Sequence, residues 1–352
     1  MANIIPIKAS FPKKQLQNLY CLSPFINIHI EVNGSVSLCG CPGWGDLSIG
    51  NIFETPLIDL LSSPKAVAIR ESVITGTYEF CNEKQCAVLI NNDLNTKETV
   101  PDNVSLLLQD STKFDLPYEI KINGDKTCNL SCPSCRTSIY KSSEDEIANQ
   151  QKLGLILFNN IFDKPSDKLI MVGTSGSGEV FASPMLLNLL ANITLDKFPN
   201  FKLELHTNGL LSQKFWHKIR HLEPAIEKVV VSIDAASKET YETVRRGGKW
   251  EDLQSSLDFL KNMKSKIKFE FNGRMIFQKE NYKDAVDFYH FCKSYSIDRV
   301  EYSRLISWNT WNKLEFQQQD VLQLTHDERP MALKQIQQLQ LLPGVWFEGD
   351  FK

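Results

Sequence analysis

The sequence contains no apolar stretch as long as a membrane span, and its N-terminus, "MANIIPIKASFPKK", lacks the longer apolar core of a signal peptide. The net charge is only -3 at pH 7, which gives no general electrostatic field for nucleic acid or an anionic membrane. These absences argue against membrane and nucleic-acid partners, and we expect a cytoplasmic protein.

The overall composition is that of an ordinary globular protein, but the sequence is rich in cysteine. With 352 residues, of which 42% are hydrophobic and 23% charged, the chain has room for one large globular domain or two smaller ones. It has 9 cysteines, and in a reducing cytoplasm they indicate metal binding more than disulfides. Cys292 stands apart on a predicted helix. We expect it to be a buried packing thiol, relevant to chemistry only as a hydrogen-atom donor.

Three cysteines stand close together in the run "CNLSCPSC", as Cys128, Cys132 and Cys135. This C-x3-C-x2-C spacing follows a strand-like stretch, "LPYEIKI", and no histidine lies near it. Three thiolates at this spacing can hold three irons of a [4Fe–4S] cube and leave the fourth iron without a protein ligand. Structural zinc is the alternative, although zinc sites usually add a second C-x2-C pair or histidines.

From residue 117 the pattern alternates between strands and helices, which argues for a parallel sheet, open or closed. The predicted strands are 118–123, 168–173, 201–206, 228–234, 267–277 and 299–305. The predicted helices are 143–162, 184–194, 211–221, 249–264 and 281–295. Six strands are too few for an eight-stranded barrel.

Two further stretches have readable local patterns. Near the N-terminus, "FINIHIEV" and "GSVSLCGC" predict a β-hairpin with its turn at Asn33-Gly34, and "TPLIDLLSSPKAVAIRESVITG" predicts a helix interrupted at "SSP". Near the C-terminus, "ERPMALKQIQQLQ" indicates a polar helix.

The three-cysteine run resembles the signature of the radical S-adenosylmethionine (radical SAM) superfamily, a CxxxCxxC loop after the first barrel strand. The resemblance implies a partial (β/α)6 barrel, which agrees with the six predicted strands. It also implies that the open iron chelates the amino and carboxylate groups of S-adenosylmethionine, whose reductive cleavage releases a 5'-deoxyadenosyl radical. Ser134 departs from the family, where the residue before the third cysteine is usually aromatic and packs near the adenine.

Segments at the later strand ends resemble the parts of that family that bind S-adenosylmethionine. Gly176-Ser177-Gly178-Glu179 resembles the "GGE" motif that binds the methionine amino group, with Ser177 in place of a glycine. A simple strand-to-helix turn is the alternative for this run. An arginine of "YETVRRG" is implied to pair with the carboxylate, since its fork suits one; we choose Arg245, with Arg246 as the alternative.

Two more positions are candidates for contacts with S-adenosylmethionine. Ser232, at the end of "VVVS", matches a serine that contacts the cofactor in the family. Asn208 of "HTNG" is expected to reach the ribose, and the alternative is that Asn208 and Gly209 form only a turn.

Five cysteines precede the barrel region, one more than a cluster or a zinc ion requires. They are Cys21, Cys39, Cys41, Cys81 and Cys86. They resemble the SPASM/twitch extension of radical SAM enzymes, which holds auxiliary [4Fe–4S] clusters: Cys21 is followed by twelve residues, Gly34, four residues and Cys39. The extension normally follows the barrel, but here it precedes it, and its second half is reduced to Cys81-x4-Cys86.

We therefore expect one auxiliary [4Fe–4S] cluster, with structural zinc as the alternative. Its expected ligands are Cys21, Cys39, Cys81 and Cys86. Cys41 is then an alternative to Cys39 or a free thiol, and with Cys292 it is the second candidate for a hydrogen-atom donor.

The predicted fold class is α/β, a partial (β/α)6 barrel with a small N-terminal cysteine-rich α+β module. The predicted segments are a lead-in 1–20, an auxiliary-cluster module 21–86, a linker 87–116, a radical SAM core 117–306 and a C-terminal extension 307–352. From these segments we expect no separate N-terminal domain that binds a leader peptide.

The resemblance implies an enzyme that abstracts hydrogen from an unactivated C–H bond. The implied substrate is a ribosomally made peptide, since SPASM/twitch relatives mostly modify such peptides. Dehydrogenation or epimerisation of a sugar or aminoglycoside is the alternative reaction, and a non-catalytic iron–sulfur or zinc module is the alternative of a different class. The implied partner is an electron donor such as flavodoxin or ferredoxin.

Overall fold

The fold is described from a computed structural model of the chain. The described residues are 16–40, 47–82, 86–90, 93–112, 119–123, 125–175, 178–349 and 351. The chain divides into two compact units. Unit 1 comprises Met1–Gly124, Ile147–Gly173 and Leu195–Phe201, and unit 2 comprises Asp125–Glu146, Thr174–Thr194 and Lys202–Lys352.

The N-terminal half of unit 1 is built on a small mixed sheet. Strand β1 (Asn27–Glu31) pairs antiparallel with β2 (Ser35–Ser37) and parallel with β4 (Glu119–Asn123), while β2 pairs antiparallel with β3 (Ser48–Asn51). Gly34 forms the β1–β2 turn with φ +81°, a conformation that favours glycine. The predicted hairpin is therefore confirmed, and it leads the chain from Cys21 toward Cys39.

Short helices surround that sheet in the sequence. They are α1 (Ser23–Ile26), α2 (Leu57–Leu61), α3 (Pro64–Ile74), α4 (Ala87–Ile90), α5 (Asp102–Ser105) and a 3-10 turn (Leu107–Gln109). The predicted interruption at "SSP" is confirmed between α2 and α3. There the Ser63 hydroxyl accepts a hydrogen bond from the Ala66 N–H, and Pro64 occupies the first turn, where its missing N–H costs nothing.

The predicted linker 87–116 contributes side chains to the core of unit 1. Val100 and Val104 are buried in one apolar cluster with Phe25, Val73 and Tyr78. This cluster lies beside the N-terminal cysteines, because Cys21 and Cys81 pack against it.

Unit 2 contains five parallel strands. Side by side in the sheet, their order is β10-β9-β8-β7-β6. They are β6 (Phe201–Thr207), β7 (Ile226–Ser232), β8 (Glu270–Phe277), β9 (Arg299–Arg304) and β10 (Val345–Glu348). A further strand, β5 (Ile170–Ser175), precedes them in the chain. The six predicted strands of the barrel region correspond to β4–β9, and β10 was not predicted.

Helices connect these strands, as in a βαβ arrangement. They are α6 (Glu144–Leu157) with a π-helical end (Phe158–Phe162), α7 (Pro184–Asn192), α9 (Lys238–Val244), α10 (Trp250–Lys266), α11 (Ala285–Ser294), α12 (Lys313–Gln319) and α13 (Arg329–Leu339). The prediction of one helix over 211–221 is wrong. The chain instead forms α8 (Ser212–Phe215) and two 3-10 segments, Trp216–Lys218 and Arg220–Ala225. Pro224 lies inside the last segment and cannot donate a helical hydrogen bond. Single 3-10 turns, Val180–Ala182 and Tyr282–Asp284, precede α7 and α11.

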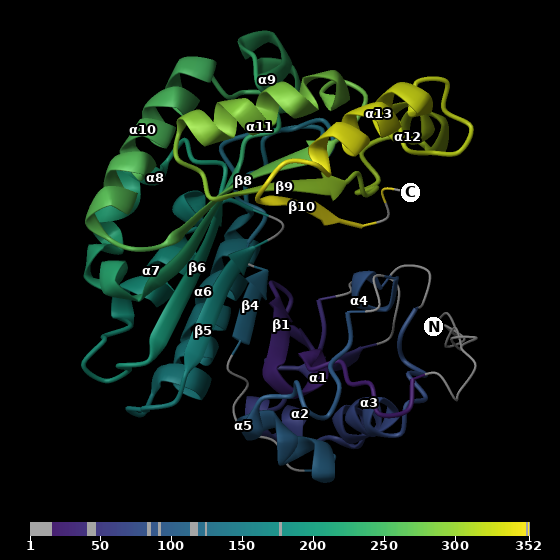
Figure 1. The fold of residues 1–352 in the computed structure, drawn as a ribbon. Helices are drawn as coiled ribbons and strands as arrows, with labels where there is room; N and C mark the ends of the chain where they lie inside the picture. Colours follow the sequence, from purple (N-terminus) through teal and green to yellow (C-terminus); the bar gives the residue numbers. More distant parts are fainter. Residues whose placement is uncertain are drawn as a thin grey trace. The chain divides into compact units, whose positions relative to one another are not determined.

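The strands of unit 2 have one apolar and one polar face, as β8 shows. A Cβ added at Gly273 would lie 2.8 Å from the Cys292 sulfur of α11, so Gly273 and its face mates Phe271 and Met275 point toward the helices. Asn272 and Arg274 point to the opposite face. In Figure 1 the green helices α10 and α11 run along the outer side of these strands. The α/β class is confirmed.

Candidate functional site

The loop that carries Cys128, Cys132 and Cys135 follows β4 in sequence and belongs to unit 2. The backbone N–H groups of Cys135 and Arg136 both donate to the carbonyl of Cys132, each at 2.9 Å. Cys132 is buried, and the other two cysteines are partly exposed. Local hydrogen bonds therefore fix the C-x2-C part of the spacing.

The sulfur of Cys128 lies close to two N–H donors. The Leu130 N–H lies 3.4 Å from it, and the Asn208 carboxamide nitrogen lies 3.8 Å from it. The same Asn208 nitrogen donates to the Asn129 side chain at 2.8 Å. Asn208 therefore joins the end of β6 to the cysteine loop. The proposed contact with ribose stays a prediction.

Two arginines face the other two sulfurs. Nη1 of Arg245 lies 3.7 Å from the sulfur of Cys132, and Nη2 of Arg136 lies 3.5 Å from the sulfur of Cys135. Donors and positive charge at this distance stabilise thiolate over thiol. All three sulfurs of the loop therefore have a nitrogen donor within reach, as the thiolate ligands of an iron–sulfur cluster require.

The thiol pKa values show two opposing effects. Burial raises the pKa of Cys128 and of Cys132, and the neighbouring charge of Arg245 lowers that of Cys132 without cancelling the rise. Cysteines that bind metal do so as thiolates, and metal binding releases their protons. Burial therefore opposes ionisation of the Cys128 and Cys132 thiols, and the surrounding donors favour it.

Arg245 is held in place by a buried carboxylate. Its Nη2 lies 2.8 Å from Oδ2 of Asp234, a residue with φ +66° whose side chain is 2% exposed. Burial pushes the pKa of Arg245 down, but the charge of Asp234 outweighs this and the pKa ends above its usual value. Oδ1 of Asp234 accepts from the Ile276 N–H at 2.7 Å. Asp234 thus fixes the guanidinium between β7 and β8.

Arg246 has a different function from its neighbour. Its Nε donates to the Ser131 hydroxyl at 3.1 Å, and its Nη2 donates to the carbonyls of Arg136 and Thr137 at 3.1 and 2.8 Å. The Ser131 N–H donates in turn to the Arg246 carbonyl at 3.0 Å. Arg246 therefore anchors the backbone of the cysteine loop, while Arg245 points to the sulfur of Cys132.

Glu179 organises the loop after β5. Its carboxylate is buried and accepts from the Asn208 N–H and the Thr207 hydroxyl, each at 2.6 Å, and from the Phe181 N–H at 3.2 Å. Burial raises the pKa of Glu179, although these donors counteract the rise. These hydrogen bonds hold the ends of β5 and β6 together, and the contact of Glu179 with S-adenosylmethionine stays a prediction.

The glycine-rich run lies directly against the cysteine loop. The Glu179 N–H donates to the Thr127 carbonyl at 2.8 Å, and a Cβ at Gly178 would lie 2.2 Å from the Asp125 carbonyl oxygen. Glycine is therefore required at position 178 for close approach of two backbones. Gly176 and Ser177 of the same run lie outside the described residues.

Ser232 lies at the carboxyl end of β7, next to β6. Its hydroxyl lies 3.4 Å from Nε2 of His206. Parallel strands bring their carboxyl ends to one edge, so Ser232, Asn208 and Glu179 share that edge with the cysteine loop. The predicted candidates within the described residues of unit 2 are therefore brought together, although their contacts with S-adenosylmethionine stay predictions.

In unit 1 the described N-terminal cysteines line one cavity of about 170 Å³ with a mostly apolar wall. They are Cys21, Cys39, Cys81 and Cys86. Cys21 precedes α1, Cys39 follows β2, and the other two follow α3, so the cavity joins segments that are far apart in the sequence. The remaining candidate, Cys41, lies outside the described residues.

Tyr78 holds two of these segments together. Its hydroxyl accepts from the Cys21 N–H at 3.0 Å and donates to the Leu19 carbonyl at 2.7 Å. Its own carbonyl accepts from the Cys81 N–H at 3.0 Å. Tyr78 has φ +48°, a conformation uncommon for a non-glycine residue, and this buried tyrosine fixes Cys21 beside Cys81.

Both cysteine groups match the donor sets of iron–sulfur clusters. Four thiols around one apolar cavity suit a cube in which every iron has a protein ligand, and three thiols suit a cube with one open iron. Among the described residues, no three side chains of histidine, cysteine, aspartate or glutamate converge on one metal ion. A cube does not need such convergence, because each thiolate binds a different iron.

The unit 2 site also has an open donor for a carboxylate ligand. Nε of Arg245 is buried and has no hydrogen-bond partner among the described residues. A buried N–H of this kind is costly unless a ligand or water accepts from it. The guanidinium therefore fits the predicted contact with the carboxylate of S-adenosylmethionine.

Cys292 lies in the core between α11 and β8. It has no exposed surface, and burial raises its pKa well above the usual value for a thiol. These observations agree with a packing thiol, and they give no path to a substrate. Its use as a hydrogen-atom donor stays an untested prediction.

Sequence reasoning missed several residues of the site. Asp234, Arg136 and Tyr78 have no motif that marks them, and the anchoring function of Arg246 could not be separated from that of Arg245. The one available signal was the position of Asp234 as the last residue of the predicted strand 228–234, at the end where parallel sheets place their sites.

Comparisons with known families agree with this geometry. The model of the SPASM iron-sulfur cluster-binding domain matches residues 21–87, and the model of the radical SAM superfamily matches residues 123–292. None of the curated proteins matches the sequence. No helix of the described chain combines the length and the apolarity that crossing a membrane requires.

Solved structures give distant fold similarities. Streptococcus suis SuiB bound to precursor peptide SuiA is 13% identical with TM-score 0.43, covering 94% of this chain and 73% of that one. Native anSMEcpe with bound AdoMet is 17% identical with TM-score 0.38, covering 54% and 52%. Methylornithine synthase (PylB) is 13% identical with TM-score 0.35, covering 54% and 53%. The chain thus spans about half the length of the last two proteins.

Proposed function

Since this chain belongs to the radical SAM superfamily, with a SPASM segment ahead of the radical SAM segment, we propose that it modifies a ribosomally made peptide at an unactivated C–H bond. The superfamily membership points to an enzyme with a [4Fe–4S] cluster, S-adenosylmethionine and an auxiliary iron–sulfur cluster as cofactors, and with a partial (β/α)6 barrel. When bound, the cluster and S-adenosylmethionine supply a 5'-deoxyadenosyl radical that abstracts the hydrogen atom. The peptide substrate is proposed from the SPASM resemblance.

The observation that carries the proposal is the set of nitrogen donors around the cysteine loop. Cys128, Cys132 and Cys135 each have a side-chain nitrogen donor, and the donors on the first two sulfurs, Asn208 and Arg245, come from distant segments. A loop that merely turned the chain would not need polar side chains aimed at every sulfur. We assign the three cysteines to the site cluster.

The neighbouring residues are proposed to bind and orient S-adenosylmethionine. Arg245 offers its buried Nε to the carboxylate, and Asp234 keeps the guanidinium from rotating. Glu179 fixes the backbone of the glycine-rich run, which is proposed to accept from the methionine amino group. Ser232 lies on the neighbouring strand end and is proposed to contact the same cofactor.

The N-terminal cavity is proposed to hold one auxiliary [4Fe–4S] cluster on its four cysteines, named above. With every iron ligated by protein, such a cluster suits electron transfer from the substrate or structural support. A cytoplasmic electron donor, such as flavodoxin or ferredoxin, is the proposed partner.

The test is reductive cleavage of S-adenosylmethionine by the anaerobically reconstituted full chain with dithionite. We expect 5'-deoxyadenosine by mass spectrometry in the wild type, none above background in Cys128→Ala, and wild-type amounts in Cys292→Ala, which removes a cysteine outside both groups. If Cys128→Ala cleaves as well as the wild type, the proposed function is wrong. Iron bound without any cleavage in the wild type would indicate the non-catalytic module instead.

A further inference from the structure

The face of the unit 2 strands that points away from α10 and α11 carries polar and charged side chains. On β8 these are Glu270, Asn272 and Arg274, which alternate with the apolar residues of the other face. Barrels with packed interiors fill this face with branched apolar residues instead. Charged residues at this position indicate a surface that binds a polar molecule.

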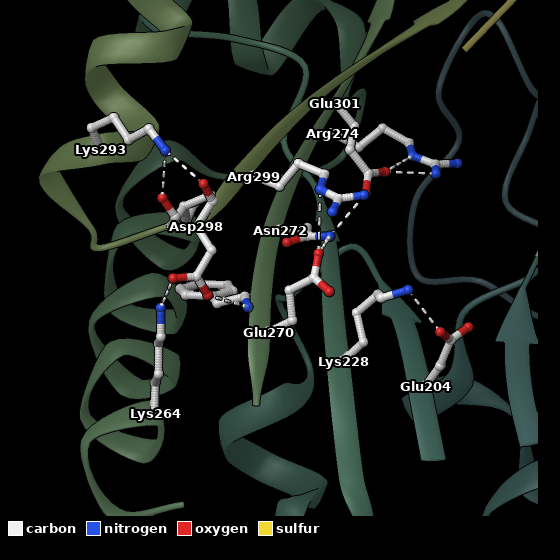
Figure 2. A network of polar contacts seen from close by, with 12 residues as sticks. Glu204, Lys228, Lys264, Glu270, Asn272, Arg274, Lys293, Asp298, Arg299 and Glu301 are labelled. Atoms are coloured by element: carbon white, nitrogen blue, oxygen red, sulfur yellow. Dashed lines mark hydrogen bonds and ion pairs between the residues drawn. The ribbon is translucent and has the colours of Figure 1, made fainter. Parts of the chain in front are cut away.

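Two basic side chains on this face each pair with one carboxylate. Lys228 of β7 lies 2.7 Å from Glu204 of β6, and Arg299 of β9 lies 3.4 Å from Glu270. Figure 2 shows these pairs beside the group formed by Arg274 and Glu301. Each of these two pairs balances one positive charge with one negative charge.

Arg274 is different, because it lies between two carboxylates. Its Nε and Nη2 lie 2.8 and 2.6 Å from Oε2 of Glu301, whereas its Nη1 lies 3.4 Å from Oε2 of Glu348. Glu301 is buried and also accepts from the Asn272 carboxamide at 2.9 Å. The positive charge of Arg274 therefore mainly balances the negative charge of Glu301. The group formed by Arg274, Glu301 and Glu348 therefore has an excess of one negative charge.

Glu348 is the accessible member of this group. Its side chain is 53% exposed, against 8% for Glu301. Within the described chain, Oε2 of Glu348 also accepts a hydrogen bond from the Ser303 hydroxyl at 2.7 Å. Trp346, two residues earlier on the same face of β10, is 50% exposed and already packs against the guanidinium of Arg299 at 5.5 Å. The exposed carboxylate of Glu348 therefore lies on the same face as an exposed aromatic ring, and the carboxylate suits a cation.

The strand register connects this group to the site described above. Ser232 pairs with Arg274, Arg274 with Glu301, and Glu301 with Trp346, which gives one row across β7–β10. Neighbouring strands lie about 4.8 Å apart, so Arg274 is one strand from Ser232. The Arg274 carbonyl also accepts from the N–H of Asp234 at 3.2 Å.

One further acceptor lies on this face. The Asn272 carboxamide donates to Glu270 and Glu301, at 2.8 and 2.9 Å, while its oxygen is buried and accepts no hydrogen bond from the described residues. This buried oxygen adds to the negative potential of the face, which again favours a cationic ligand.

We propose that Glu348, with Trp346 and the Arg274–Glu301 pair, binds a protonated amine of the substrate. This inference rests on the proposed function, because it places the amine at the same strand edge as the radical site. The amine belongs to a lysine side chain if the substrate is a peptide, or to an amino sugar if the substrate is a sugar. Glu348 supplies the charge, and Trp346 supplies an apolar wall.

The test measures binding by isothermal titration calorimetry to the reconstituted full chain with S-adenosylmethionine and without reductant. The peptide probes are acetyl-Gly-Lys-Gly-amide and its uncharged norleucine analogue, and the sugar probes are glucosamine and glucose. We expect the charged member of one pair to bind at least about tenfold more tightly than its neutral analogue. The pair that shows this preference identifies the source of the amine.

Variants then assign the preference to its residue. Glu348→Gln is expected to abolish it, Glu348→Asp to retain part of it, and Glu227→Gln to leave it intact. Glu227 is the matched control, because it is 49% exposed, pairs with Lys202 and lies at the amino end of β7. Thermal unfolding checks that Glu348→Gln still folds, as the exposure of Glu348 predicts.

Equal binding of charged and neutral probes by the wild type would overturn the inference. So would a preference that persists in Glu348→Gln, or absence of binding by every probe. The titration needs no turnover, so it is independent of the cleavage assay. A chain that forms 5'-deoxyadenosine but shows no amine preference refutes this inference alone, whereas an amine preference without cleavage refutes the proposed function alone.

Discussion

In unit 2 three cysteines lie within eight residues of the sequence, and polar side chains face their sulfurs. In unit 1 four cysteines spread over 66 residues line one mostly apolar cavity. The first arrangement is local, and its polar donors suit the proposed cluster with one open iron. The second depends on tertiary packing, because its cysteines come from segments that lie far apart in the sequence. The two regions therefore place cysteines in different environments, which suits the different tasks proposed for them.

Removing one cysteine from each group tests whether the tasks are separate, and we expect this to give the largest effect. Cys128→Ala should lower 5'-deoxyadenosine formation at least about 100-fold, since even changes outside the ligand shell of a metal cost 10–100-fold. Cys86→Ala should instead lose about four of about eight irons and keep the cleavage. Iron analysis and mass spectrometry read both outcomes. Equal loss of cleavage in the two variants would show that the regions act as one.

The arginine that supports unit 1 should matter next. Arg70 is buried, and its guanidinium donates to the carbonyls of Pro24 and Leu61 at 3.1 and 2.9 Å. Burial lowers its pKa to about 10. Arg70→Met leaves these carbonyls without their donor, so unfolding of unit 1 should become easier by about 3 kcal/mol. Urea unfolding measures the change, with Arg70→Lys as the milder control; an unchanged midpoint in Arg70→Met would contradict it.

Acid should weaken unit 1 through His29. Burial, and then the charge of Lys121, lower the pKa of His29 from 6.5 to about 4. The unfolded chain therefore binds a proton between pH 6.5 and 4 that the folded chain excludes, so stability is complete above pH 6.5 and falls as the pH drops toward 4. Between pH 6.5 and 5 the loss should be about 2 kcal/mol.

Urea unfolding at several pH values measures this dependence, with loss of the unit 1 iron as the signal that reports unfolding. His29→Gln stays neutral throughout and should flatten it. If the variant and the wild type lose stability in parallel, His29 is not its source.

The smallest effect should come from the arginine that supports the unit 2 loop. Arg246 is exposed, unlike Arg70, although it also donates to backbone carbonyls. Arg246→Met should therefore cost only about 1 kcal/mol, with modestly faster loss of the loop iron. Arg220→Met, another exposed arginine, is the control. An effect as large as that of Arg70→Met would remove the contrast between the two anchors.

Local patterns predicted most of the elements. The hairpin at Asn33-Gly34, the helix break at Pro64 and the strands of unit 2 follow from turn chemistry, proline and apolar periodicity, which act within a few residues. The failures share a cause as well. The segment 211–221 has helical periodicity but forms short 3-10 turns, and β10 has too few residues to stand out until β9 pairs with it.

The functional residues divide in the same way. Spacing and family resemblance pointed to the cysteines, Glu179 and Arg245. The partners of these residues, Asp234 and Arg136 among them, did not emerge, because no rule of spacing links Arg245 to a carboxylate eleven positions earlier.

The sequence by itself determined the three-cysteine loop, the alternation of strands and helices, and the order in which a SPASM segment precedes a radical SAM segment. These depend on neighbours along the chain. Only the tertiary structure brought four distant cysteines to one cavity, separated the functions of Arg245 and Arg246, and set Arg274 between Glu301 and Glu348. Such contacts depend on strand register and side-chain packing, which join residues whose separation in the sequence carries no periodic signal.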